Sequence, residues 1–277
     1  MEGFKPEKTL CVDWFNPGNM IKLGMLNNRY VAIKEGRYLT REIEILKKIQ
    51  FHPNIVEFIS ETEGGFIMTG VKDGYTLYDY CRNYVRRNPK LENNRPFTIR
   101  TCVNMINQIS QALKYLHGLK IIHHDLKDKN VLVDETVLED ISSYHLKLCD
   151  FGCSELTDDE GFGSEANRES GTSHWMAPEQ RKIQSEKPIT RITNKIDIYA
   201  FGCLCVEILT FNRTSKELVE QCHPPMIYDI AFLCQSNDPN VRPDINEISQ
   251  IFEILNQNDN LEQLKDFRTT VKWDSNM

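Results

Sequence analysis

The sequence lacks the features of a membrane or secreted protein. No stretch contains the roughly 18–20 apolar residues needed to span a bilayer. The first ten residues, MEGFKPEKTL, have neither the basic region nor the long apolar run of a signal peptide. An excess of positive charge is also absent, since 33 Lys and Arg residues face 40 Asp and Glu residues and the net charge is −7. We therefore expect an intracellular protein, cytoplasmic or nuclear, with no membrane insertion and no nucleic-acid partner.

Cysteine pairs of the kind that form disulfide frameworks or zinc sites are missing as well. The nine cysteines are scattered along the chain. The close pair Cys203 and Cys205 has no second ligand cluster to complete a tetrahedral metal site. Reduced, mostly buried thiols are the expected state, as in other intracellular proteins.

The predicted elements are strand-rich at the start of the chain and helical afterwards. Residues 30–34 (YVAIK) have the β-branched composition of a half-buried strand, and residues 40–50 place apolar side chains at helical spacing. Residues 98–119 form a longer amphipathic pattern, and residues 196–209 are apolar nearly all round, which predicts a buried helix. Between these helices, residues 153–172 are rich in glycine, serine and acidic residues, which predicts a long functional loop.

Three short motifs occur in the order that phosphoryl transfer from ATP requires. Lys34 ends the VAIK strand and could hold the α- and β-phosphates. In the segment HHDLKDKN, Asp125 would accept or orient the proton of a substrate hydroxyl, and Asn130 would bind Mg²⁺. Asp150 of the tripeptide DFG would hold the Mg²⁺ that bridges the β- and γ-phosphates. Each motif is common alone, but the three together fit one template over more than a hundred residues.

With these motifs the sequence resembles the eukaryotic protein-kinase family over nearly its whole length. The segment GTSHWMAPE at 171–179 looks like the end of an activation segment. Arg242 lies where the family places the ion-pair partner of Glu179, and Asp197 matches the aspartate that braces the catalytic loop from a buried helix. We expect these three residues to be structural.

The resemblance implies an α+β, bilobal protein-kinase fold. A small β-rich N-lobe with one short helix would occupy about residues 1–72. A larger helical C-lobe would occupy about 73–257, and a polar tail would follow at 258–277. We expect residues 1–277 to form a single protein kinase domain.

The resemblance also implies an enzyme that uses ATP and Mg²⁺ to phosphorylate Ser or Thr hydroxyls of a protein substrate. Lys127, two positions after Asp125, is typical of serine/threonine kinases, where it steadies the γ-phosphate. Thr172 matches the threonine that packs near these two residues. The pair Trp175-Met176 is similar to the tyrosine-kinase-like branch, which leaves dual specificity open.

The nucleotide site departs from the family in the loop that covers the phosphates. The G-x-G-x-x-G frame falls on Asp13, Phe15 and Gly18, so only the third glycine remains. Glycine lets backbone amides close over phosphates without a side chain in the way. We expect reduced nucleotide affinity, or a loop framed differently, with Ala32 and Leu132 sandwiching the adenine as in the family.

Lys34 needs a carboxylate partner on the helix that follows it. Glu42, eight residues later, is our candidate. Glu44 is the alternative, although it faces another side of a helix. The interval from Lys34 to Glu42 is about half the usual one in the family.

His124 replaces the arginine that usually precedes the catalytic aspartate. That arginine commonly pairs with a phosphorylated residue of the activation loop. A histidine is mostly neutral near pH 7 and pairs more weakly with phosphate. We therefore expect weak dependence on phosphorylation of this loop, with Ser170, Thr172 and Ser173 as the open candidates.

An active protein kinase is the leading interpretation. The alternative is a catalytically weak or inactive pseudokinase that acts as a binding or scaffold module. The lost glycines and the short helix favour the alternative, whereas the complete set Lys34, Asp125, Asn130 and Asp150 opposes it. A small-molecule phosphotransferase of the same fold is disfavoured by the complete segment 171–179.

Overall fold

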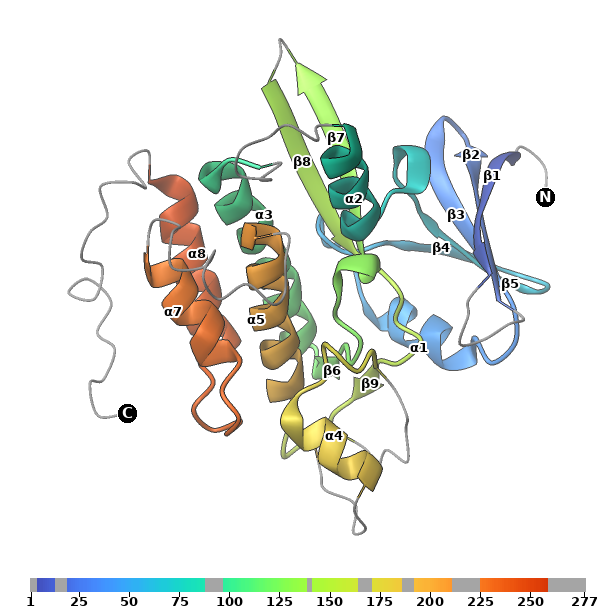
Figure 1. Ribbon diagram of the computed structural model, residues 1–277. Helices are drawn as coiled ribbons and strands as arrows, with labels where there is room; N and C mark the ends of the chain where they lie inside the picture. Colours follow the sequence, from blue (N-terminus) through green and yellow to red (C-terminus); the bar gives the residue numbers. More distant parts are fainter. Residues whose placement is uncertain are drawn as a thin grey trace.

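The computed structural model of the chain is drawn in Figure 1. It describes residues 4–12, 19–87, 97–138, 141–163, 171–185, 192–210 and 225–258. Among these residues no helix is long and apolar enough to cross a membrane. The sheet-rich first part and the helical second part form two lobes, which confirms the predicted α+β class.

The first lobe contains a five-stranded antiparallel sheet in the order β1-β2-β3-β5-β4. Its strands are β1 (Lys5–Val12), β2 (Met20–Leu26), β3 (Arg29–Glu35), β4 (Phe58–Thr62) and β5 (Gly65–Thr69). Asn27 and Asn28 join β2 to β3 with φ angles of 50° and 62°, the left-handed conformation that suits a two-residue hairpin turn. The predicted strand 30–34 lies within β3, which brings Lys34 beside β5.

Helix α1 (Thr40–Lys48) follows β3 directly and lies between the sheet and the helical lobe (Figure 1). Its buried residues are Glu42, Ile45 and Leu46. Ile45 and Leu46 join a hydrophobic core that continues from the sheet into the second lobe. The helix predicted at 40–50 is therefore confirmed, and Glu42 is the carboxylate that this packing places inside.

The second lobe is built mainly of helices. Its helices are α2 (Leu77–Arg87), α3 (Ile99–Gly118), α4 (Pro178–Ser185), α5 (Lys195–Thr210), α7 (Pro225–Cys234) and α8 (Ile245–Gln257). Helices α3 and α7 pack against α5, and α8 packs against α3. As predicted, α5 is buried on most of its surface. It approaches α7 closely, because a Cβ atom on Gly202 would lie 2.7 Å from the carbonyl oxygen of Ala231. Thr98 caps the start of α3, its hydroxyl accepting a hydrogen bond from the Thr101 backbone N–H.

Short strands and turns between the helices carry the segments that hold the motifs. They are β6 (Ile121–Ile122), η2 (Asp128–Asn130), β7 (Val131–Leu138), β8 (Ile141–Leu148) and β9 (Glu155–Leu156), with η1 (Lys72–Gly74) before α2. β7 and β8 pair along their full length as a hairpin, and β6 pairs with β9. The predicted loop 153–172 therefore contains the short strand β9. Its residues 164–170, and the predicted tail after residue 258, lie outside the described residues.

Candidate active site

Lys34 lies at the centre of a buried group of charges. Its Nζ is 2.9 and 2.7 Å from the two carboxylate oxygens of Glu42 and 2.9 Å from Oδ1 of Asp150. Lys34 and Glu42 are almost fully buried, whereas Asp150 is half-buried. The partner of Lys34 is thus Glu42, as predicted. Glu44, the alternative, is exposed on the other side of α1.

The two carboxylates fix the charge state of this group. Burial acts to lower the pKa of Lys34, but the negative charges of Asp150 and Glu42 outweigh it and raise that pKa well above its ordinary value. For Asp150, burial acts to raise the pKa, and the Lys34 ammonium overcomes this effect and lowers it. Lys34 is therefore a permanent cation and Asp150 a permanent anion at neutral pH.

The catalytic loop predicted at residues 123–130 is held by a buried carboxylate of α5. Asp197 accepts hydrogen bonds from the backbone N–H groups of His123 (2.8 Å) and His124 (2.9 Å). Its Oδ2 also lies 3.0 Å from Nε2 of His117 on α3. Burial acts to raise the pKa of Asp197, but His117 and then His123 with its backbone N–H lower it, so the group stays ionised. The bracing role expected of Asp197 is confirmed.

Asp125 is surrounded by donors from its own loop and from the segment after residue 170. Lys127 Nζ is 2.5 Å from Oδ2, and Asn130 Nδ2 donates to the Asp125 carbonyl (2.8 Å) and to Oδ2 (3.1 Å). The backbone N–H and hydroxyl of Thr172 lie 3.1 and 3.2 Å from Oδ1. Lys127 also donates to the Thr172 hydroxyl at 2.9 Å. Asp125, Lys127, Asn130 and Thr172 therefore form one cluster, as the sequence predicts.

The Lys34 group and the Asp125 cluster are joined through the backbone. The N–H of Cys149, the residue before Asp150, donates to the carbonyl of Asn130 at 3.0 Å. The His123 ring lies 3.2 Å from the Cys149 carbonyl and 5.0 Å from the centre of the buried Phe151 ring. The cluster of Asp125 and the cluster of Lys34 thus belong to one connected site.

Two residues of this site adopt a left-handed backbone conformation. Asp150 has φ of 64° and His124 has φ of 70°. Non-glycine residues seldom adopt this conformation, and it concentrates at functional sites whose surroundings enforce it. At His124 the enforcing contact is the hydrogen bond to Asp197, and at Asp150 it is the bond to Lys34.

The donor set fits a magnesium ion bound together with phosphate. Asn130 uses its amide nitrogen toward Asp125, so its oxygen is the atom suited to a cation. Asp150 offers a half-exposed carboxylate. Among the described residues no three His, Cys, Asp or Glu side chains are grouped so that they could hold a metal. Mg²⁺ commonly takes one or two protein ligands and completes its shell with phosphate and water.

The residues predicted around the adenine, Ala32 and Leu132, lie in different lobes. Ala32 is buried on β3, opposite Met68 of β5. Leu132 is half-buried on β7, which belongs to the second lobe. The predicted remnant of the phosphate-covering loop, Gly18, lies outside the described residues together with Asp13 and Phe15.

The segment 171–185 is anchored to the lower lobe by a buried ion pair. Arg242 binds Glu179 through two contacts of 2.6 and 2.8 Å, and its side chain is completely buried. It also donates to the carbonyl oxygens of Ser236 and Lys195. The predicted pair of Glu179 with Arg242 is confirmed, and it fixes α4 against α5.

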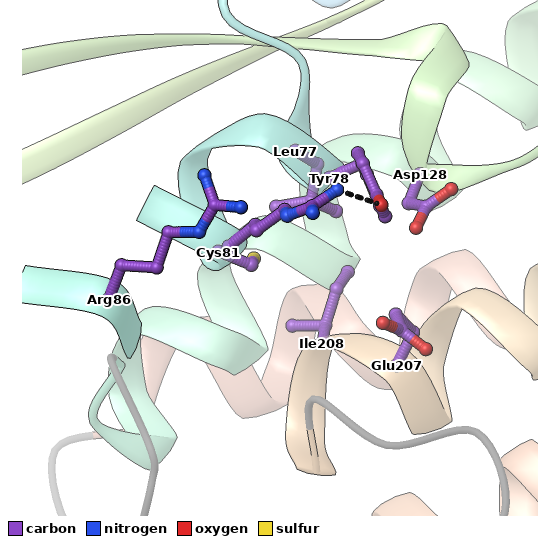
Figure 2. A pocket seen from close by; sticks show the side chains of 8 residues that line it. Leu77, Tyr78, Cys81, Arg86, Asp128, Glu207 and Ile208 are labelled. Carbon is purple, nitrogen blue, oxygen red and sulfur yellow. Dashed lines mark hydrogen bonds between the residues drawn. The ribbon is translucent and has the colours of Figure 1, made fainter. Parts of the chain in front are cut away.

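A pocket of about 280 Å³ lies beside the catalytic loop, between α2, η2 and α5 (Figure 2). Leu77 and Cys81 contribute apolar surface, and Arg82 donates to the Tyr78 hydroxyl at its rim. Asp128 and Glu207 also line it, and so does Arg86. Because two carboxylates and two guanidinium groups line the same space, its charge favours no single class of ligand.

Sequence reasoning missed three residues that support the site. They are His117, which contacts Asp197, Glu155, which contacts His124, and Arg41, which contacts Glu155. His117 is one of many polar residues in the amphipathic segment 98–119, so the sequence alone does not single it out. Arg41 and Glu155 carry no local signal either, because they meet only through the packing of α1 on β9.

Comparison with known proteins agrees with this geometry. Residues 21–268 match the family described as Protein kinase domain. The chain is 30% identical over 261 residues to the Serine/threonine/tyrosine-protein kinase HT1 of Arabidopsis thaliana, covering 83% of this chain and 61% of that protein. It is 28% identical over 261 residues to the Probable serine/threonine-protein kinase kinX of Dictyostelium discoideum, covering 85% and 21%.

A human relative is similar to the same extent. The chain is 28% identical over 265 residues to the Dual specificity testis-specific protein kinase 2 of Homo sapiens, covering 87% of this chain and 43% of that protein. The chain therefore spans between about a fifth and three fifths of the length of these relatives.

Proposed function

Because the chain belongs to the protein kinase family, we propose that it transfers the γ-phosphoryl group of ATP to Ser or Thr hydroxyls of a protein substrate. The observation that carries this proposal is the pair of joined clusters. Lys34 is held by Glu42 and Asp150, and Asp125 is held by Lys127 and Asn130. Positioning and charge stabilisation are what phosphoryl transfer asks of a protein.

Each cluster has its own part in the reaction. Asp125 accepts the proton of the acceptor hydroxyl while that oxygen bonds to the γ-phosphorus. The bond from the γ-phosphorus to the bridging oxygen breaks, and ADP leaves. Lys127 lies beside Asp125 and offsets negative charge on the transferred group. Lys34 holds the α- and β-phosphates, and its fixed positive charge supports that role.

ATP and Mg²⁺ would be bound by residues of both lobes. Ala32 and Leu132 would contact the adenine, and Gly18 would belong to the loop over the phosphates. Asn130 and Asp150 would hold the magnesium ion, which neutralises phosphate charge when it is bound. Asp150 would hold it as a carboxylate, since its pKa is lowered.

The preference for Ser and Thr is supported by the contact between Lys127 and Thr172. The names of the relatives point both ways, since one is a probable serine/threonine kinase and another a dual-specificity kinase. We assign serine and threonine as the main acceptors. An intracellular location is supported by seven cysteines that are free thiols, from Cys81 to Cys234. The domain would extend over residues 1–277.

The test is phosphate transfer from γ-labelled ATP to a general protein substrate such as casein, with Mg²⁺, followed by phosphoamino-acid analysis. We expect label on serine and threonine from the wild type and none from Asp150→Ala. Glu44→Gln, on the exposed side of α1, serves as the matched control and should transfer as the wild type does. Absence of transfer, with nucleotide binding that ignores Mg²⁺, would instead support the pseudokinase alternative.

A further inference from the structure

Glu155 is a buried carboxylate at the start of the loop that follows Asp150. Its side chain is 1% exposed. It belongs to β9, whose pairing with β6 sets Glu155 opposite Ile122, two residues before His124. A carboxylate removed from water is unfavourable unless donors surround it, so the groups around Glu155 indicate its role.

These groups come from two different elements. Oε1 of Glu155 lies 2.7 Å from Nε2 of His124, and Oε2 lies 3.5 Å from Nη2 of Arg41 on α1. Because the carboxylate is the acceptor, Nε2 of His124 carries the hydrogen in this contact. His124 directly precedes Asp125, and Arg41 directly precedes Glu42. The Glu155 carboxylate thus connects His124 and Arg41, the residues that precede Asp125 and Glu42.

The loop backbone covers the same carboxylate from a third side. A Cβ atom on Gly163 would lie 2.2 Å from Oε1 of Glu155. The N–H of Gly163 is fixed by a 2.8 Å hydrogen bond to the carbonyl of Ile192. Since this space admits no side chain at residue 163, the Glu155 carboxylate is held in place between His124 and the loop.

We propose that Glu155 is a positioning residue that holds the catalytic loop and α1 in their working arrangement without phosphorylation of the loop that contains it. The inference rests on the proposed kinase activity. His124 already contacts this fixed carboxylate, and a phosphate brought to the same place would meet like charge.

The position of Thr172 supports the same conclusion. Its hydroxyl accepts a hydrogen bond from Lys127 and lies 3.2 Å from Asp125 Oδ1. A phosphate on this hydroxyl would place about two negative charges beside the carboxylate that must accept a proton. Phosphorylation of Thr172 would therefore disrupt the site and not assemble it.

The kinetic test compares Glu155→Gln with Asp159→Asn. Asp159 lies on the same loop and is fully exposed, so it is a matched control. We expect Glu155→Gln to lower kcat at least ten-fold and to raise KM for ATP at least three-fold, and Asp159→Asn to stay within two-fold of the wild type. Loss of folded protein alone would lower kcat and leave KM unchanged. If Glu155→Gln does not fold, Gly163→Ala is used in its place. It crowds the same carboxylate and should give the same fall in kcat and rise in KM for ATP.

Further variants test the contact of Glu155 with Arg41 and its contact with His124 one at a time. Arg41→Gln should mainly raise KM for ATP, because α1 carries the partner of Lys34. His124→Leu should mainly lower kcat, because His124 adjoins Asp125, and His124→Gln should restore part of the loss by keeping a donor. Equal effects of Arg41→Gln and His124→Leu on both constants would contradict the proposal.

Phosphatase treatment of the wild type tests whether activity depends on phosphorylation. We expect activity to stay within two-fold after complete dephosphorylation, and a loss of ten-fold or more would overturn the proposal. If the untreated wild type transfers no phosphate, the proposed function fails instead. Hydrogen exchange then tests Glu155 independently, since Glu155→Gln should exchange faster than Asp159→Asn in α1 and in residues 121–126. Equal exchange in the two variants would overturn the role of Glu155.

Discussion

Replacing Glu42 by glutamine should have a large effect on both stability and ATP use. The substitution keeps the shape of the side chain but removes a charge that lies 2.7 Å from Lys34 Nζ. Both side chains are almost completely buried, at 6% and 3% exposure. At an effective dielectric constant of about 20, unit charges at this distance attract by about 6 kcal/mol. The cost of desolvating both groups offsets part of this attraction.

Breaking a buried ion pair by removing one partner typically costs about 3–5 kcal/mol. Asp150 still contacts Lys34 after the substitution, so we expect the lower end, about 3 kcal/mol, in the free energy of unfolding. Glu44→Gln changes the same kind of residue on the exposed side of the same helix and should cost less than about 0.5 kcal/mol. Urea unfolding at pH 7 measures both values.

The double variant Lys34→Met/Glu42→Met separates charge from packing. Apolar side chains of similar size commonly replace a buried ion pair with little loss of stability. We therefore expect the double variant to be more stable than Glu42→Gln while transferring no phosphate. In the activity assay, Glu42→Gln should raise KM for ATP at least ten-fold. Equal unfolding free energies for Glu42→Gln and Glu44→Gln would refute the reasoning.

Three further predictions concern other parts of the molecule. Asp197→Asn should lower the unfolding free energy by about 3 kcal/mol at pH 7. Because the folded-state pKa of Asp197 lies below its ordinary value of 3.8, the wild-type advantage should shrink as pH falls below that value, and a constant difference in urea unfolding would contradict this. Burial raises the pKa of Cys153 to about 12 and that of Cys81 further, so mass spectrometry should find both alkylated by iodoacetamide more slowly in the folded than in the unfolded protein at pH 8. Gly202→Ala should lower stability by about 1–3 kcal/mol, because its Cβ would lie 2.7 Å from the Ala231 carbonyl, and an unchanged melting temperature would contradict this.

The sequence allowed prediction of the contacts that depend on short motifs at fixed spacing. Lys34 and Glu42 are eight residues apart, so a strand followed at once by a helix places them together. The partner of Glu179 and the bracing role of Asp197 followed from the resemblance to the family. Lys34 and Asp197 also stand out in the sequence as charged residues in apolar segments, which mark positions that need a partner.

Other features depend on how separate elements pack, and the sequence contained no local sign of them. The contact of Glu155 with Arg41 joins residues more than a hundred positions apart. The length of the β7–β8 hairpin was not predicted either, because its outer half mixes polar and apolar residues without a clear strand alternation. Part of its support comes from distant aromatic residues, since the Tyr144 ring lies 5.5 Å from Tyr80 and 5.0 Å from Phe97.

The anchoring of the catalytic loop by α5 also sets the order in which the site can form during synthesis. Asp197 follows His123 by 74 residues, so the loop leaves the ribosome well before its anchor. At roughly 5–20 residues per second, about 4–15 seconds separate the two events. By the later part of that interval the nascent chain contains Lys34, Asp125 and Asp150, but the backbone amides of the loop still lack the Asp197 carboxylate that they bind. The proposed catalytic site is therefore complete only after the docking of a helix that contributes none of the proposed catalytic residues.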